Sequence, residues 1–348
     1  MRPDPAYWAD RTVCVTGGTG FLGYHLVKLL GDLGARVRVF ALAPPADHPV
    51  RRFAHVEIIA GDILDAASVR SALAGCSTVV HAAGIVAVWG PSVKKMWPVH
   101  VEGTRNVLNA LDPGARLVHT SSVVAVGASR SGEVLNEESR FNLAGVKLAY
   151  VQAKRAAEEL ALGSDREVVV VNPGYLIGPE DYEQSVMGKL CHRFWRGRAP
   201  LAPPGGLNLV DVRDVAVGHL LAAERGTRGR RYILGGENLR YADFMRTMAD
   251  VAGMRPRWLP TIPRPIFSVG ALLNEARGRL RGKEPYPSLA HVRLNRYYWF
   301  FSSDRARREL EYEPRSVRES LADAFAWSSG RERFHVRGFN RWLLRTSE

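Results

Sequence analysis

Tyr150 and Lys154 stand four residues apart in the stretch Tyr-Val-Gln-Ala-Lys. Four residues are just over one helical turn, so a helix would place both side chains on one face. A free phenol has a pKa of about 10 and is a poor proton donor or acceptor at neutral pH. A neighbouring ammonium favours the phenolate and is expected to lower that pKa. The pair is therefore a candidate proton-transfer device for interconverting a hydroxyl and a carbonyl group.

The residues around this pair are typical of a helix. Apolar residues recur at helical spacing between positions 148 and 161, Lys and Glu fill the gaps, and Gly163 ends the pattern. Tyr and Lys also occur four apart by chance in many helices. The chemistry can therefore be assigned only together with the elements that would hold a cofactor and a substrate beside the pair.

A glycine-rich turn near the start of the chain is such an element. A strand is predicted at 12–16 and runs directly into Gly17, Gly20 and Gly23, after which leucines at helical spacing predict a helix. Gly17 permits a tight turn, Gly20 lets the backbone approach a pyrophosphate, and Gly23 lets the helix pack on the strand. The free N–H groups at the start of the helix would bind the phosphates. This sequence predicts a dinucleotide site.

Strands and helices alternate along the first half of the chain. Strands rich in β-branched residues are predicted at 36–42, 56–60, 78–81, 116–120 and 167–171, with crossover helices at 66–74 and 93–111. The alternation predicts an α/β fold with a Rossmann doubly wound parallel sheet.

The domain organisation follows from a change of pattern after residue 179. We expect a dinucleotide-binding domain at 11–179 that also receives 207–235, including a last short strand at 232–235. Prolines and helical patterns in 180–206 and 236–330 predict a smaller, mostly helical substrate-binding annex. Residues 331–348 are expected to form a basic tail.

Small residues follow the strand predicted at 78–81. Ala82, Ala83 and Gly84 would leave room for a flat ligand at the carboxyl edge of the sheet, where open α/β sheets bind their ligands.

The end of the second strand bears on the choice between NAD and NADP. An acidic residue there would bind the ribose 2′-hydroxyl of NAD, whereas an arginine would suit the 2′-phosphate of NADP. Leu42 is neither, while Arg38, Arg51 and Arg52 lie nearby in sequence. We expect NAD(P) with a slight preference for NADP.

Composition restricts the class of protein. Lys plus Arg number 48 against 35 Asp plus Glu, a formal net charge of +13, yet no basic block with interleaved aromatics indicates a nucleic-acid partner. Three cysteines without CxxC spacing indicate neither a disulfide framework nor a metal site. No stretch approaches the ~18 apolar residues of a membrane span, and no signal peptide is recognisable. The expected location is the cytoplasm.

With the glycine turn, Ser122 and the Tyr150–Lys154 pair in register, the chain resembles the extended short-chain dehydrogenase/reductases over roughly residues 11–330. The resemblance implies that Ser122 holds the substrate oxygen, Tyr150 carries the proton, and Lys154 holds the nicotinamide ribose. It further implies a small-molecule substrate and a homodimer. The cofactor-binding residues that it implies, besides Tyr150 and Lys154, are Gly17, Thr19, Gly20, Phe21, Leu22, Gly23, Asp62, Ile63, Ala82, Ala83, Gly84, Pro173 and Tyr175.

Two branches of that family were compared. Sugar-nucleotide epimerases usually carry an Asn at the position of Tyr175. Phe141-Asn-Leu, Trp89 with its neighbours and Trp299-Phe-Phe look like the dihydroflavonol-reductase and 3β-hydroxysteroid-dehydrogenase branch. The run 205–214 is similar to proteins called hopanoid-associated sugar epimerases. Residues expected to meet the substrate are Trp89, His100, Tyr175 and Tyr182.

His100 departs from the family pattern, which has an Asn at the start of His-Val-Glu-Gly-Thr. Its ring can replace the Asn as a hydrogen-bonding group, although histidine is also the side chain whose charge can change near neutral pH. We favour a structural substitute over an added catalytic group.

The favoured function is an NAD(P)-dependent oxidoreductase acting on a carbonyl or secondary alcohol of a partly hydrophobic substrate. One alternative is a sugar epimerase that oxidises its substrate transiently with bound NAD. A second is a catalytically silent NAD(P)-sensing or scaffold protein, against which the intact Ser–Tyr–Lys set counts. The apolar stretch 262–273, followed by Arg277, Arg279 and Arg281, is expected to be an ordinary lid helix, with peripheral membrane contact as the less favoured alternative.

Overall fold

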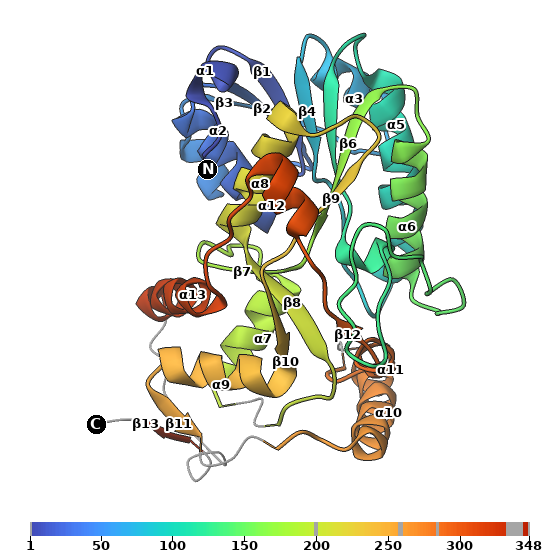
Figure 1. Ribbon diagram of the computed structural model, residues 1–348, viewed down its shortest axis with the longest axis vertical. Helices are drawn as coiled ribbons and strands as arrows, with labels where there is room; N and C mark the ends of the chain where they lie inside the picture. Colours follow the sequence, from blue (N-terminus) through green and yellow to red (C-terminus); the bar gives the residue numbers. More distant parts are fainter. Residues whose placement is uncertain (1, 198–200, 257–259, 283–284, 332–343, 347–348) are drawn as a thin grey trace.

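Seven parallel strands form the central sheet of the computed structural model, which describes residues 2–197, 201–256, 260–282, 285–331 and 344–346 (Figure 1). The strand order β3-β2-β1-β4-β5-β6-β9 reverses beside β1, which creates the crevice where such sheets bind dinucleotides. The strands are β1 (Thr12–Thr16), β2 (Arg36–Ala41), β3 (Val56–Ala60), β4 (Thr78–His81), β5 (Arg116–Thr120), β6 (Glu167–Pro173) and β9 (Arg231–Leu234).

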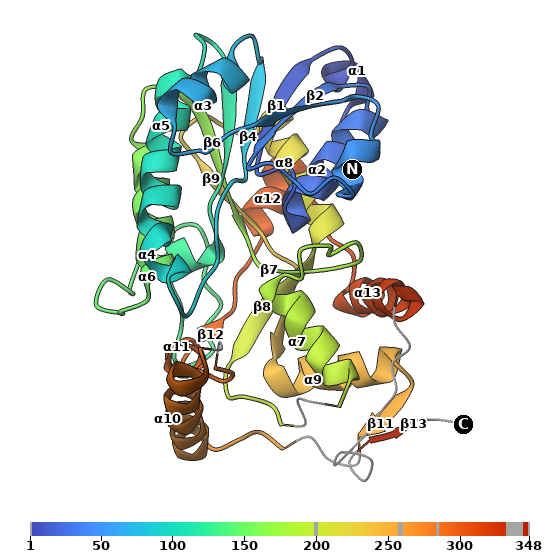
Figure 2. The same ribbon diagram turned by 180° about the vertical axis from the view of Figure 1, so that it is seen from behind.

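Helices cover both faces of this sheet, which confirms the predicted doubly wound fold (Figures 1 and 2). Val13, Val15 and other apolar side chains of one face pack against α2 and α8, and those of the other face pack against α3 and α5. Helices therefore cover the apolar side chains of both faces, as is usual for a parallel sheet. The helices around this sheet are α1 (Pro5–Trp8), α2 (Phe21–Asp32), α3 (Ala66–Leu73), α5 (Gly103–Ala110), α6 (Ala149–Leu162), α8 (Val212–Arg225) and α12 (Asp304–Leu310).

The helix predicted at 93–111 is interrupted by a wider turn. It consists of α4 (Ser92–Trp97), a π-helical segment η2 (Pro98–Glu102) and α5. Pro98 has no N–H to donate, so the regular hydrogen-bond ladder cannot continue through it. π-Helical turns occur often at functional sites, and this one carries His100.

A second, smaller sheet lies below the main sheet in the view of Figure 1. It joins β7 (Tyr175–Ile177), β8 (Gly206–Asp211), β10 (Glu237–Arg240) and β12 (Tyr298–Trp299). Of residues 207–235, which the sequence assigns to the dinucleotide-binding domain, α8 and β9 return to the main sheet, whereas β8 pairs within the second sheet. The chain leaves the main sheet at Gly174, where a side chain would collide with Asn208 of β8, and this close contact draws β7 and β8 together.

Helices surround the second sheet: α7 (Val186–Trp195), α9 (Tyr241–Val251), α10 (Arg264–Arg281), α11 (Leu289–Leu294) and α13 (Val317–Arg331). In the predicted basic tail, β13 (Leu344–Thr346) pairs with β11 (Met254–Pro256), and the rest of 332–348 lies outside the described residues. Among the helices that the structure describes, none has the length and apolar content to cross a bilayer.

Candidate active site

The residues expected to do chemistry meet at the carboxyl edge of the main sheet. Because all seven strands are parallel, the glycine turn after β1, Ala82 after β4, Ser122 after β5 and Pro173 at the end of β6 lie along one edge. Tyr150 is the second residue of α6, whose N-terminal end lies near the same edge (Figure 1). The fold therefore collects side chains that are more than a hundred residues apart in the chain.

Ser122, Tyr150 and Lys154 come together as the sequence predicts. The Ser122 hydroxyl lies close enough to the Tyr150 phenol to lower its pKa. The Lys154 ammonium is buried and donates to the carbonyl oxygen of Thr120, with an Nζ–O distance of 2.8 Å. The roles that the family resemblance gives to the three remain predictions, but the geometry suits them.

The pKa of Tyr150 moves in the opposite direction to the one expected. Burial of the phenol raises its pKa above the usual value, and the nearby Ser122 hydroxyl offsets this only in part. The expected lowering by Lys154 is wrong for the free protein, because that ammonium is bound to Thr120 rather than directed at the phenol. Tyr150 is therefore protonated at neutral pH and ready to donate.

Burial lowers the pKa of Lys154 to about 8, and Glu158 opposes the effect. A decrease from 10.5 to about 8 corresponds to roughly 3 kcal/mol in favour of the neutral amine. Glu158 is fully buried and was not identified from the sequence, although it lies one turn after Lys154 on the same face of the helix.

Glu158 fixes α6, the helix that carries Tyr150 and Lys154, to the main sheet. One carboxylate oxygen accepts from Arg231 of β9 at 3.0 Å, and the other accepts from the side-chain amide of Asn172 of β6 at 2.5 Å. The same amide also donates to the Ser122 carbonyl oxygen at 3.0 Å. The helix carrying Tyr150 and the strand end carrying Ser122 are thus held by one buried group.

Four buried histidines, His81, His100, His119 and His219, surround Lys154. Burial is the largest cause of a lowered pKa in each, and the Lys154 charge lowers it further. All four are therefore neutral at neutral pH. His219 bonds the Thr120 hydroxyl at 2.9 Å, and His81 bonds Thr16 of β1 at 2.8 Å.

His100 does not undergo the charge change near neutral pH that a histidine allows. Burial and Lys154 lower its pKa to about 3, so the ring stays neutral. Its Nε2 donates to the Ile85 carbonyl at 2.8 Å, and its edge contacts the Tyr150 ring, with centroids 5.8 Å apart. This arrangement supports the structural-substitute interpretation. The ring also occupies the space that Gly84 was expected to leave for a ligand.

The glycine turn has the shape that a pyrophosphate needs. A β-carbon at Gly17 would lie 2.7 Å from Ala83, and one at Gly23 would lie 2.1 Å from the Gly17 carbonyl, so both glycines are required by packing. A β-carbon on Gly20 would meet nothing closer than 3.4 Å. The protein therefore leaves space at Gly20 and the following helix start, where Phe21 and Leu22 begin α2. These residues fit a dinucleotide phosphate.

Only some of the residues expected to bind the adenosine half of the cofactor are accessible to it. Asp62 is exposed after β3, but Ile63 is buried against Gly103. Arg38 is not available to a ribose phosphate, because its guanidinium binds Glu57 and the carbonyl oxygens of Ala72 and Ala74. Those acceptors lie beside the amino end of the sheet, so this part of the NADP expectation is wrong.

Arg51 remains beside the loop that follows β2. Its guanidinium donates to the carbonyl oxygens of Pro44 and Pro45 at 2.9 and 3.0 Å. His48 of the same loop contacts the carbonyl oxygen of Thr19 at 3.1 Å and so ties the loop to the glycine turn. Leu42 is 69% exposed at the edge of this region.

The residues expected to meet the substrate do not all gather at the trio. Tyr175 lies close enough to Tyr150 for their charges to interact. Trp89 lies in the loop between β4 and α4, partly exposed. Tyr182 packs against Tyr24 and Trp327 in a cavity of about 520 Å³ whose lining includes Phe21 but none of the trio.

Three tyrosines that no spacing in the sequence relates, Tyr175, Tyr241 and Tyr286, lie in succession within range of one another's charges, starting near Tyr150, and are called the aromatic row. Tyr241 lies close to both Tyr175 and Tyr286. The Arg193 guanidinium sits 4.4 Å from the centre of the Tyr286 ring. These residues come from β7, α7, α9 and the segment before α11, and no spacing in the sequence relates them.

Comparison with known proteins gives the same fold and a family. The family described as "NAD dependent epimerase/dehydratase family" matches residues 13–235. A protein from Synechocystis sp., provisionally named dihydroflavonol 4-reductase, is 32% identical over 92% of this chain and 96% of its own length. Sterol demethylase protein B from Methylococcus capsulatus is 33% identical over 91% of this chain and 98% of its own length. The crystal structure of gox2253 has a TM-score of 0.80 and 32% identity, and covers 94% of this chain and 100% of that one.

Two glycines of the turn should respond differently to substitution. Gly20→Val should leave the protein folded and abolish dinucleotide binding, because the added side chain enters the space meant for the ligand. Gly23→Val should lower the free energy of unfolding, because its β-carbon overlaps the Gly17 carbonyl. Calorimetry with NADH and NADPH and urea unfolding of both variants measure this difference. Unchanged affinity in folded Gly20→Val would refute the assigned site.

The buried ammonium predicts a pH-dependent stability. The unfolded chain keeps the Lys154 proton up to a pH near 10.5, whereas the folded protein releases it near 8, so the unfolded state binds more protons between these values. Stability relative to Lys154→Met should therefore rise with pH above 8, by at most ~1.4 kcal/mol per pH unit. Urea unfolding of both proteins between neutral pH and pH 10 measures the difference, and parallel curves would contradict the burial of a charged Lys154.

Proposed function

This chain belongs to the NAD dependent epimerase/dehydratase family, and from that premise we propose that it is an NAD(P)-dependent oxidoreductase that interconverts a carbonyl and a secondary alcohol. When bound, the nicotinamide would supply or accept the hydride. The residues of the chain would orient the substrate and move the proton. Ser122 would hold the substrate oxygen, and Tyr150 would donate to it or accept from it.

The observation that carries this proposal is the close approach of the Ser122 hydroxyl to the partly buried Tyr150 phenol, beside the buried Lys154 ammonium. Because burial keeps the phenol protonated, Tyr150 is suited to donate to a carbonyl oxygen that gains negative charge. Lys154, positively charged below a pH of about 8, would then stabilise the phenolate that remains. A protonated Tyr150 and a charged Lys154 are the states that donation of a proton to a carbonyl oxygen requires.

A partly hydrophobic substrate is supported by the aromatic row. Tyr175, Tyr241 and Tyr286 would supply flat apolar walls beyond the trio, with Arg193 at the far end. The names of the two relatives given above refer to ring-containing carbonyl or sterol compounds, which fits the same class. We propose a ring-containing carbonyl compound, bound against Tyr175 and Trp89.

An epimerase with tightly held NAD is the second candidate. The match to the family model favours it, because that family includes epimerases by description. Against it stands Tyr175, since the sugar-nucleotide epimerases that the sequence resembles usually have an Asn there. A tightly bound cofactor that survives purification, with no net consumption of added NAD(P)H, would favour the epimerase.

Further expectations from the sequence belong to the same proposal. We propose that residues 11–179 with α8 and β9 hold the cofactor, and that 180–206 and 236–330 hold the substrate. All three cysteines are buried and unpaired, which supports a reducing cytoplasm. A homodimer is proposed from the family resemblance alone.

NADPH is proposed to bind somewhat more tightly than NADH. Arg51 stands beside the loop after β2, where the ribose 2′-phosphate would lie, and no acidic side chain follows that strand directly. An exposed charge contact of this kind is worth about 1 kcal/mol at most.

Tyr150→Phe should reduce turnover by at least ~100-fold while NAD(P)H affinity stays within a few-fold, because the ring remains and only the donor is lost. The substrate for this assay comes from mass spectrometry of copurifying ligands and from a panel of ring-containing ketones. Tyr298→Phe is the matched control, since that tyrosine lies in β12 and is not part of the trio. Substantial activity in Tyr150→Phe would overturn the mechanism.

The cofactor preference should be small and sensitive to salt. NADPH should bind no more than ~10-fold more tightly than NADH, and Arg51→Gln should remove most of that difference. Titration of both cofactors at low and high salt measures it, with Arg38→Gln as the control that should leave the ratio unchanged. A large preference for NADH that salt does not affect would show that an acidic group, such as Asp47, reaches the ribose instead.

A further inference from the structure

Helix α10 has two apolar faces, and only one of them is covered. Phe267 and Ala271 are buried and pack with Val292 of α11. The opposite face is apolar as well but open to solvent. Its exposed fractions are 63% for Ile266, 58% for Val269, 58% for Leu272, 56% for Leu273 and 88% for Leu280. No other element of the described structure shows so many exposed large apolar side chains.

The charges on α10 are arranged around that exposed face. Projected down the axis at about 100° per residue, the five side chains lie within an arc of about 120°, and Arg277 and Arg279 project from its two edges. The helix carries four arginines and a single glutamate. That glutamate, Glu275, faces the packed side, because it accepts from the Leu289 amide and also pairs with Arg279.

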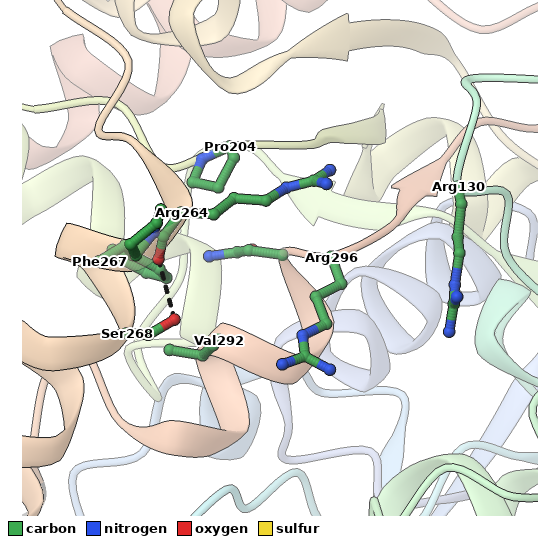
Figure 3. A pocket seen from close by; sticks show the side chains of 9 residues that line it. Arg130, Pro204, Arg264, Phe267, Ser268, Val292 and Arg296 are labelled. Carbon is green, nitrogen blue, oxygen red and sulfur yellow. Dashed lines mark hydrogen bonds between the residues drawn. The ribbon is translucent and has the colours of Figure 1, made fainter.

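A basic cavity of about 360 Å³ lies at the N-terminal end of the same helix (Figure 3). Arg264, Arg296 and Arg130 reach it from three different segments, and Phe267 and Val292 supply apolar lining. Among the residues that the structure describes, no carboxylate pairs with any of these three guanidinium groups, although all three line one cavity. The cavity therefore carries uncompensated positive charge beside an apolar face.

We propose that α10 and this arginine-lined cavity dock the protein on the surface of an anionic phospholipid bilayer. The apolar arc would enter the acyl boundary, Arg277 and Arg279 would extend to the headgroups at its edges, and a lipid phosphate would bind between Arg264 and Arg296. The helix would lie in the plane of the membrane, in keeping with the finding that it cannot span one.

Charge favours a bilayer over a second copy of the chain as the occupant. Two α10 helices face to face would bring their arginines together, and each chain carries a formal net charge of +13. An anionic surface instead neutralises the charge that surrounds the apolar arc.

Docking would also place the bilayer near the candidate substrate walls, a consequence that rests on the proposed function. Asn274 of α10 donates to the Tyr286 carbonyl at 3.1 Å, so the helix is tied to the end of the aromatic row. An apolar substrate could pass from the membrane along that row.

Vesicle flotation of the full-length protein tests the docking surface independently of turnover. The wild type should bind vesicles of phosphatidylcholine with phosphatidylglycerol and should not bind phosphatidylcholine alone. Leu272→Asp/Leu273→Asp should weaken partitioning at least ~10-fold, as should Arg264→Gln/Arg296→Gln on the anionic vesicles. Val134→Asp is the apolar control, since Val134 is 50% exposed outside α10, and Arg140→Gln/Arg308→Gln is the charge control. Both controls should bind like the wild type.

Circular dichroism and light scattering of every variant distinguish the remaining outcomes. Lost vesicle binding with unchanged folding and oligomeric state supports the proposal. Failure of the wild type to bind anionic vesicles overturns it. A leucine variant that dissociates an oligomer and still binds vesicles would show that the apolar arc is an interface between copies, which also overturns it. Equal loss of binding in the charge control would mean general attraction to a basic protein rather than this site.

Discussion

A single buried positive charge, the ammonium of Lys154, sets most of the arrangement around the candidate site. A charge removed from water needs a compensating group and hydrogen-bond acceptors. Here the carbonyl oxygen of Thr120 accepts directly, and Glu158 lies one turn further along the helix. Glu158 is itself fully buried and is held by Arg231 and Asn172. The charge, its acceptor and its counter-ion thus connect α6 to three adjacent strands, β5, β6 and β9.

That chain of contacts also explains the precise relation between Ser122 and Tyr150. The Ser122 backbone is held by Asn172, which is held by Glu158, which belongs to the same helix as Tyr150. The surrounding histidines stay neutral because burial and the nearby ammonium both oppose a second positive charge. Their neutrality leaves Lys154 as the main cation that the phenol can meet, and makes His100 a hydrogen-bonding spacer rather than an acid.

The sequence was sufficient to predict those elements whose structure depends on neighbouring residues alone. The strands at 56–60, 78–81 and 116–120 have the bounds that the sequence predicts, because short apolar runs between turn residues are typical of strands. The glycine turn and the helix of Tyr150 were equally clear, since both follow from backbone conformation and helical spacing. The pairing of β8 with β7 and β10 in a second sheet was not predictable, because an apolar run of six residues carries no information about which strands it will pair with.

Sequence alone thus determined the fold class, the glycine turn and the placement of Tyr150 and Lys154 on one helix, since each depends on residue type and short spacing. Tertiary structure decided which charges compensate one another: it directed Arg38 to Glu57, placed Glu158 against Arg231, and raised rather than lowered the pKa of Tyr150. It also brought Tyr175, Tyr241 and Tyr286 into one row and left one face of α10 uncovered. The physical reason is that desolvation and charge compensation depend on the distance and burial of groups far apart in the chain, which no local pattern encodes.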